Sequence, residues 1–260
     1  MYFDSHAHYD DAAYNTDREA VLQKVRNAGV EGIVDCASDL KSLDRVNELA
    51  ERHKFIYAAF GFHPGDIGGL DEEAVSLLYD YAESCARTVA IGEIGLDYHY
   101  PDNPSKEMQQ DWFIEQIEMA KDLELPIIVH SRDAAKDTYD ILKEYDGARN
   151  GGVIHSYSGA PELAKEYVRL GFHLGIGGMV TFQNAKKVVA TVAEIPLEHL
   201  LLETDCPYLA PAPYRGKRND SSNLQYIAAR IAEIKGVSAE EVARITTENA
   251  RRLFRLEDAE

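Results

Sequence analysis

Residues 2–8 read YFDSHAH, a short apolar run that ends in two histidines one residue apart. The run Tyr2–His6 predicts a β-strand, and the residues after it distinguish two α/β folds. A doubly wound sheet that binds a nucleotide has a glycine-rich turn after its first strand, whereas this chain has His6-Ala7-His8 there. The turn therefore favours a barrel of the TIM type over the open sheet.

The rest of the chain alternates short apolar runs with longer amphipathic stretches. The further predicted strands are Gly32–Cys36, Ile56–Phe60, Thr88–Glu93, Ile127–His130, Val153–His155, Phe172–Ile176 and Leu200–Thr204. The predicted helices are Thr16–Ala28, Leu40–Arg52, Asp71–Ser84, Ser105–Leu123, Ala134–Tyr145, Glu162–Leu170, Asn184–Ala193, Ser222–Lys235 and Ala239–Phe254. Alternation of this kind is typical of βαβ units on a parallel sheet.

Eight such units in 260 residues match a fold for which about 250 residues is typical. We therefore predict an α/β fold, a TIM (β/α)8 barrel with additional C-terminal helices. No internal repeat, low-complexity tract or Pro/Gly linker divides the sequence, so we predict a single domain over residues 1–260.

Composition limits the classes of partner. The net charge of −18 argues against tight, sequence-independent binding of a long duplex, because phosphate binding relies on lysine and arginine. No apolar run approaches the ~20 residues of a membrane helix, and no secretory signal is evident. The three cysteines, Cys36, Cys85 and Cys206, are far apart in the sequence and suit a reducing cytosol. We therefore expect a cytoplasmic protein with no membrane partner and no obligate protein partner.

Chemistry-bearing residues gather where the predicted strands end. Functional side chains of a βα barrel lie at the C-terminal ends of its strands, and five of the nine histidines fall there. These are His6, His8, His63, His130 and His155. Glu93 and Asp205 end or follow two other strands, and an unpaired carboxylate is costly to bury. A site that gathers these side chains would offset that cost.

Each of these residues also has a plain structural interpretation. His6 and His8 share one face of a strand because side chains alternate, yet an isolated pair of this kind is also compatible with two solvated polar residues. His130 and His155 taken singly are compatible with hydrogen-bonded structural histidines, and Glu93 with a salt bridge. The agreement of six residues at equivalent strand ends favours a metal site over six separate coincidences.

Five ordered motifs resemble one known family. They are His6-Ala7-His8, Gly92-Glu93-Ile94-Gly95-Leu96-Asp97-Tyr98, His130-Ser131-Arg132-Asp133-Ala134, His155-Ser156-Tyr157-Ser158-Gly159 and Glu203-Thr204-Asp205-Cys206-Pro207-Tyr208-Leu209. In this order they resemble the TatD-family metal-dependent deoxyribonucleases, which belong to the amidohydrolase-like barrels. The resemblance covers residues 4 to about 254. Departures such as Cys206, where serine is usual, touch no expected ligand and bear on substrate preference.

The resemblance implies a site for two divalent metal ions. His6, His8 and Asp205 would hold one ion, His130 and His155 the other, and Glu93 would bridge them. Imidazole and carboxylate ligands suit Zn, Mn, Fe or Co, and the family resemblance also allows Mg, so we expect Mg, Mn or Zn. Glu93 and Asp205 would be the catalytic carboxylates, with Asp205 acting as general base, as a ligand, or as both.

Phosphate recognition needs positive charge and hydrogen-bond donors besides the metals. Arg132 is a candidate for bidentate phosphate binding, and Arg215 belongs to the only dense basic run, with Lys217 and Arg218. That run is equally compatible with a solvated loop. His63 could donate a hydrogen bond to phosphate or form a structural turn before Pro64. We therefore take His63, Arg132 and Arg215 as candidate substrate-binding residues.

The leading hypothesis is a metal-dependent hydrolase of phosphodiester bonds in DNA, a 3′–5′ exonuclease on short or single-stranded ends. A first alternative uses the same chemistry on a carbonyl, as an amidohydrolase, a lactonase or an aminoacyl-ester deacylase. A second alternative is a non-catalytic metal-binding protein, against which the complete ligand set argues.

Overall fold

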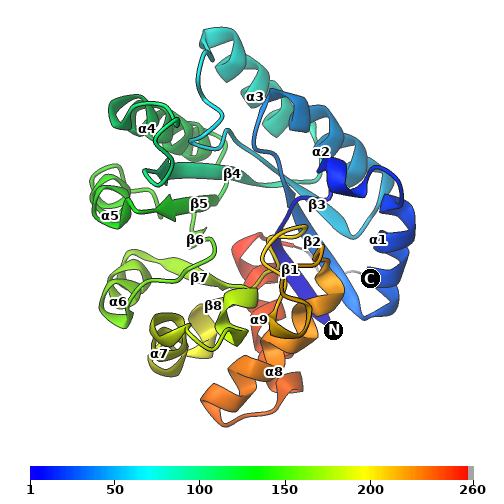
Figure 1. The fold of residues 1–260 in the computed structure, drawn as a ribbon. Coiled ribbons are helices and arrows are strands. Elements are labelled where there is room, and N and C mark those ends of the chain that lie inside the picture. Colours follow the sequence, from blue (N-terminus) through cyan, green and yellow to red (C-terminus); the bar gives the residue numbers. More distant parts are fainter. Residues whose placement is uncertain (257–260) are drawn as a thin grey trace. The chain divides into compact units, whose positions relative to one another are not determined.

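The computed structural model describes residues 1–256 and contains the eight expected strands in one sheet, ordered β1 to β8 along the chain (Figure 1). The strands are β1 Tyr2–Ala7, β2 Val30–Cys36, β3 Ile56–Phe60, β4 Thr88–Asp97, β5 Ile127–Arg132, β6 Gly152–Ile154, β7 Phe172–Ile176 and β8 Leu200–Leu202. The pairs β3–β4, β4–β5, β5–β6 and β7–β8 are parallel. The predicted α/β TIM barrel fold is therefore confirmed.

Helices alternate with the strands, and two further helices close the described chain. They are α1 Arg18–Asn27, α2 Leu40–Arg52, α3 Glu72–Ser84, α4 Lys106–Asp122, α5 Ala135–Glu144, α6 Pro161–Leu170, α7 Lys186–Glu194, α8 Leu224–Lys235 and α9 Ala239–Leu253. Local sequence explains their ends: Ser238 accepts a hydrogen bond from Glu241 N–H at the start of α9. Gly236, at φ 69°, ends α8 in the left-handed conformation that glycine favours. Within residues 1–256, none of the helices has the length and apolarity of a membrane span.

Two strands, β4 and β5, extend at their C-terminal ends well beyond the predicted bounds, whereas β1 gains only Ala7. β4 continues from Glu93 to Asp97, and β5 from His130 to Arg132, because the two extensions pair with each other. In that pairing Gly95 lies opposite His130 and Asp97 opposite Arg132. The extension brings a second carboxylate, Asp97, onto the strand that carries Glu93.

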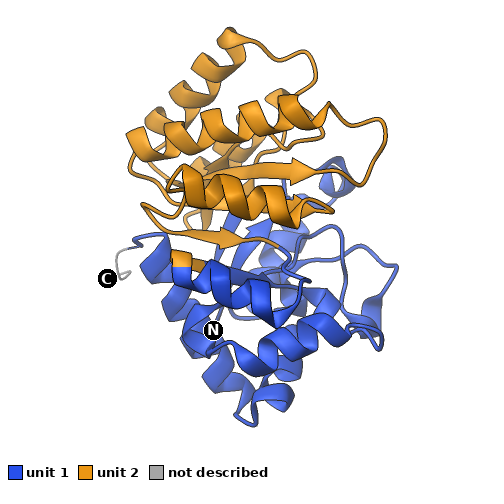
Figure 2. Cartoon of the chain, turned by 90° about the vertical axis from the view of Figure 1, so that its left-hand side faces the viewer, with its two compact units in different colours: residues 1–34, 156–169, 173–260 blue, residues 35–155, 170–172 orange. Residues whose placement is uncertain are grey.

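The chain consists of two compact units (Figure 2). Of the described residues, unit 1 contains 1–34, 156–169 and 173–256, and unit 2 contains 35–155 and 170–172. The prediction of a single domain stays a prediction.

Unit 2 is built on β3, β4, β5 and β6, whose side chains are largely buried. Helix α2 begins in a capping box, in which Asp39 accepts a hydrogen bond from Ser42 N–H, and the Ser42 hydroxyl oxygen accepts one from Asp39 N–H. In unit 1, β7 and β8 pair through Leu174 and Leu200, and α9 packs on β1 and β8. Phe3 of β1 stacks on Phe254 with ring centroids 6.1 Å apart. Burial of such apolar side chains is the main force that stabilises each unit.

His173, the second residue of β7, makes unit 1 sensitive to acid. Burial, followed by the charges of His199 and Arg252, lowers the pKa of His173 to about 4. An unfolded histidine titrates near pH 6.5, so the folded state favours the neutral ring. The stability that follows is fully present above about pH 6.5 and is lost as the pH falls toward 4.

We predict that the free energy of unfolding falls by about 2 kcal/mol less between pH 7 and pH 4.5 in His173→Gln than in the wild type. Urea denaturation at the two pH values measures the difference. The exposed His99→Gln change is the matched control and should follow the wild type. Identical pH dependence of the wild type and His173→Gln would contradict the prediction.

Candidate metal and active site

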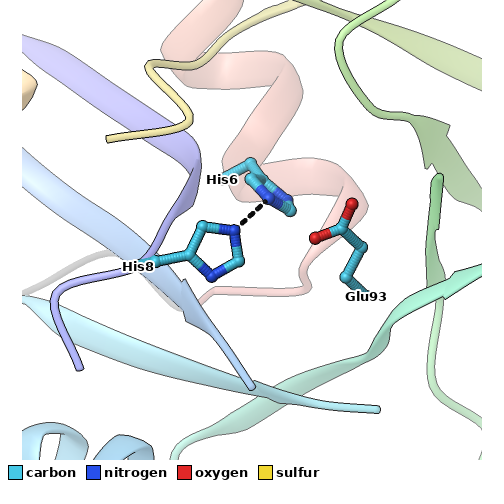
Figure 3. Close-up of side chains that lie close together, drawn as sticks. All are labelled: His6, His8 and Glu93. Atoms are coloured by element: carbon cyan, nitrogen blue, oxygen red, sulfur yellow. Dashed lines mark hydrogen bonds between the residues drawn. The ribbon is translucent and has the colours of Figure 1, made fainter. Parts of the chain in front are cut away.

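His6 and His8 at the end of β1 direct their rings toward each other. Their Nε2 atoms are 3.0 Å apart, as the dashed line in Figure 3 marks. The two residues are i and i+2 on an extended chain, so their side chains leave the same face of the strand. His6 is fully buried, and the side chain of His8 is 12% exposed. Two ring nitrogens thus point at one small region, as the sequence pattern predicts.

Asp205 lies beside this histidine pair. Its Oδ1 atom is 3.7 Å from His6 Nε2 and 3.5 Å from His8 Nε2. Backbone hydrogen bonds hold the segment against β1: Asp205 N–H donates to the His6 carbonyl, and His8 N–H donates to the Cys206 carbonyl. Asp205 has a φ of 55°, a strained conformation of the kind that concentrates at functional sites.

The spacing of these three donor atoms fits a divalent cation. Ligands at about 2.0–2.1 Å from a tetrahedral metal lie about 3.3 Å from one another, close to the observed 3.0, 3.5 and 3.7 Å. Two imidazoles and a carboxylate are also a donor set that Zn and Mn accept. Unit 1 therefore contains a set of side chains that could hold a metal ion.

A buried carboxylate, Asp4, holds this set in place. Its oxygens accept hydrogen bonds from Thr204 N–H at 2.9 Å, from the Thr204 hydroxyl at 2.6 Å and from the Ser221 hydroxyl at 2.6 Å. Thr204 directly precedes Asp205, and Asp4 lies two residues before His6 on β1. The strand that carries the histidines and the loop that carries Asp205 therefore share one hydrogen-bonded anchor.

Unit 2 gathers a second set of one carboxylate and two histidines. Glu93, whose side chain is drawn in Figure 3, is 4% exposed and ends the part of β4 predicted from the sequence. Its Oε1 atom is 2.8 Å from His130 Nδ1 and 3.8 Å from His155 Nε2. Gly95 makes the close approach of β4 and β5 possible, since a Cβ atom there would lie 2.0 Å from the His130 carbonyl oxygen. Glu93, His130 and His155 form a second candidate ligand set.

Asp97 contacts the same histidine from its other side. Its Oδ2 atom is 3.2 Å from His130 Nε2. Burial acts to raise the pKa of Asp97, but the hydrogen bonds from His130 and from His99 N–H outweigh it, and the pKa lies below its usual value. Burial likewise acts to lower the pKa of His130, but Asp97 and Glu93 outweigh it and hold the pKa above its usual value. His130 thus lies between two carboxylates.

His63 follows β3 in unit 2, with its ring centroid 4.5 Å from that of His130. Its Nδ1 atom accepts a hydrogen bond from Gly65 N–H at 3.1 Å. Since a backbone N–H can only donate, the neutral His63 ring carries its proton on Nε2. This tautomer makes His63 a hydrogen-bond donor, the role that the sequence suggests for it.

The two candidate phosphate-binding arginines each lie over an aromatic ring. The Arg132 guanidinium is 4.8 Å from the centroid of Tyr100 and donates a hydrogen bond to its hydroxyl. Arg215 lies 4.4 Å from the centroid of Phe182. Arg218 from the same basic run pairs with Asp17 through both of its terminal nitrogens. Arg218 therefore holds the loop, whereas Arg132 and Arg215 remain candidates for substrate binding.

Sequence reasoning assigned no role to Asp4 and Asp97. Asp97 is four residues after Glu93, and residues i, i+2 and i+4 of a regular strand share a face, which is a signal that the sequence contains. Asp4 is two residues before His6, and the same alternation could have marked it. The partners of both carboxylates are distant in the sequence and are visible only in the fold.

Comparison with known proteins agrees with these features. The family model of the TatD-related DNases matches residues 3–255. The Bacillus subtilis protein YabD, described as an uncharacterized metal-dependent hydrolase, is 46% identical over 98% of this chain and all of its own length. YcfH of Escherichia coli K12, also described as an uncharacterized metal-dependent hydrolase, is 36% identical over 98% of this chain and 96% of its own.

A solved structure supports the fold. The crystal structure of YjjV, a TatD homologue from E. coli K12, superimposes with a TM-score of 0.93 at 35% identity and covers 98% of each chain. The likeness extends over the whole set of strands and helices described above.

Proposed function

The chain belongs to the TatD-related DNase family of metal-dependent hydrolases, and we propose that it hydrolyses phosphodiester bonds of DNA. The preferred substrate would be a short or single-stranded 3′ end. The acidic net charge of −18 favours binding of a DNA end over binding along a long duplex.

The observation that carries the proposal is the pair of ligand sets, one in each unit. In unit 1, His6, His8 and Asp205 have donor atoms within 3.7 Å of one another. In unit 2, both His130 and His155 have a ring nitrogen within 3.8 Å of the Glu93 carboxylate. We propose that each set holds one divalent ion, Mg, Mn or Zn. The bridging role of Glu93 stays a prediction from the sequence.

Bound divalent ions would supply the positive charge that activates a water and orients a phosphodiester. The chain's own residues supply proton transfer and alignment. The Asp205 carboxylate, with its side chain 16% exposed, is reachable by water and would accept a proton from it. His63, protonated on Nε2, would donate a hydrogen bond to a phosphate oxygen.

Arg132 and Arg215 would bind phosphate groups of the substrate. Each guanidinium is oriented by the aromatic ring below it, so less freedom is lost when it pairs with a phosphate. An amide or a lactone lacks the phosphate charge that these two side chains would recognise. The arginines therefore distinguish the nuclease from the carbonyl hydrolases that share the metal chemistry.

We predict that Arg132→Ala and Arg215→Ala each lower kcat/KM on a 3′-labelled oligonucleotide about 10- to 100-fold, because each loses a charge-assisted hydrogen bond. Metal content should stay at the wild-type level. Turnover of a matched panel of DNA, amide and lactone substrates measures the effect, with the exposed Arg149→Ala as control. Unchanged DNA turnover in both variants, together with hydrolysis of a carbonyl substrate, would overturn the proposed function.

A further inference from the structure

We propose that Asp97 is a positioning residue for the metal ligand His130. It would accept the Nε2–H of His130 and so keep the proton off Nδ1, the atom that would bind the ion. The inference rests on the proposed function, because it concerns one of the two proposed ion sites.

The two nitrogens of His130 face two different carboxylates of the same strand. Nδ1 lies 2.8 Å from Oε1 of Glu93, the oxygen that also lies 3.8 Å from His155 Nε2. Nε2 lies 3.2 Å from Oδ2 of Asp97. The donor atoms of the proposed ligand set therefore converge on the Nδ1 side of the ring, and Asp97 occupies the other side. A histidine that binds a metal through one nitrogen commonly donates the other N–H to a carboxylate.

Burial and hydrogen bonds to both its side chain and its backbone hold Asp97 in one orientation. It is 2% exposed, and its second oxygen, Oδ1, accepts a hydrogen bond from His99 N–H at 2.8 Å. Gln109 of α4, itself 1% exposed, holds the backbone of Asp97 at both polar groups. The Gln109 Oε1 atom accepts from Asp97 N–H at 2.8 Å, and its Nε2 donates to the Asp97 carbonyl at 3.0 Å. The carboxylate thus presents Oδ2 to His130 in a set orientation.

The same surroundings argue against a metal ion between His63, Asp97 and His130, whose ligand atoms also lie close together. His63 accepts the Gly65 N–H at Nδ1, which leaves a proton on its Nε2. The single ring lone pair of a neutral His63, on Nδ1, already accepts this hydrogen bond, and the protonated Nε2 has none to give to an ion. A hydrogen bond from His130 to Asp97 accounts for this cluster without a metal.

The Asp97→Asn change keeps the shape of the side chain. It therefore tests the hydrogen bond to His130 and leaves the packing of the residue unchanged. The fixed donor His99 N–H would retain the amide oxygen of Asn, which turns the amide NH2 toward His130. His130 Nε2 would then have to accept a hydrogen bond, and its proton would move to Nδ1. The atom that should bind the ion would be blocked.

Two measurements on the full chain test the inference, with Zn²⁺ as the probe. Competition with a chromophoric chelator gives Zn²⁺ affinity, and 15N NMR of labelled histidines in the Zn²⁺-loaded protein locates the proton of His130. We expect Nε2–H in the wild type and, in Asp97→Asn, one Zn²⁺ ion bound about 10- to 100-fold more weakly. The matched control is Asp137→Asn, a half-buried carboxylate of α5 that accepts from the Tyr98 hydroxyl. It should bind Zn²⁺ like the wild type.

The outcomes separate the inference from the proposed function. Wild-type Zn²⁺ affinity in Asp97→Asn, or a proton on Nδ1 of His130 in the loaded wild type, would overturn the positioning role and leave the nuclease proposal standing. A proton on Nδ1 in the wild-type spectrum overturns the inference even if Asp97→Asn does not fold. A wild type that binds no Zn²⁺ overturns both, whereas normal Zn²⁺ binding without DNA turnover overturns only the proposed function.

Discussion

Replacing Glu93 with glutamine is expected to lower turnover of a 3′-labelled oligonucleotide on the order of 10³-fold, with the fold retained. Glu93 is buried beside two imidazoles, and its carboxylate is the only negative group of its predicted ligand set. Glutamine has the same shape but carries no charge, so it would hold a cation more weakly. The negative charge that develops in the transition state would then be stabilised less. A loss of several kcal/mol of such stabilisation corresponds to this factor.

Circular dichroism and metal analysis accompany the kinetics of Glu93→Gln, so that a loss of fold is separated from a loss of the ion. Glu115→Gln on the exposed side of α4 changes the same chemical group outside both proposed ligand sets and should keep wild-type turnover. Wild-type turnover in Glu93→Gln would reject the site as described.

Replacing Asp205 with asparagine is expected to lower turnover about 10²- to 10⁴-fold, the range for loss of a general base. The amide oxygen of asparagine can still lie near His6 and His8, because the backbone bonds to β1 do not depend on the side chain. Metal binding should therefore weaken less than turnover. The measurement is kcat at rising Mn²⁺ until the ion sites are saturated.

Saturation with Mn²⁺ distinguishes the two roles of Asp205. If the carboxylate accepts a proton, kcat of Asp205→Asn stays low at saturating metal. Recovery of wild-type kcat at high Mn²⁺ would show that Asp205 only holds an ion. Asp10→Asn offers no clean control, since Asp10 is buried on the loop that follows His8, whereas Asp133→Asn changes an exposed carboxylate and should leave kcat unchanged.

The eight strands could be predicted because each is a short apolar run between amphipathic stretches. Runs such as Ile56–Phe60 and Phe172–Ile176 have the same bounds in the structure as in the prediction. The pairing of His6 with His8 also follows from sequence, since strand geometry places residues i and i+2 on one face. Local pattern suffices for features of this kind.

The remainder depends on contacts between distant residues. The last residues of β4 become strand only because β5 continues alongside them, and no local pattern specifies how long two strands stay paired. Gln109 is a helix residue of ordinary type whose three hydrogen bonds to Asp97 and Pro104 exist only in the folded unit. For the same reason, the anchoring of Thr204 and Ser221 by Asp4 could not be predicted.

Metal titration of the chelator-treated protein shows whether DNA cleavage depends on two bound ions. Mn²⁺ is added in steps while bound ions per chain and cleavage of a 3′-labelled oligonucleotide are measured on the same samples. We predict no cleavage without metal, and cleavage that rises with occupancy and is complete at two ions per chain. Full cleavage by the metal-free protein, or saturation below one ion per chain, would contradict the claim.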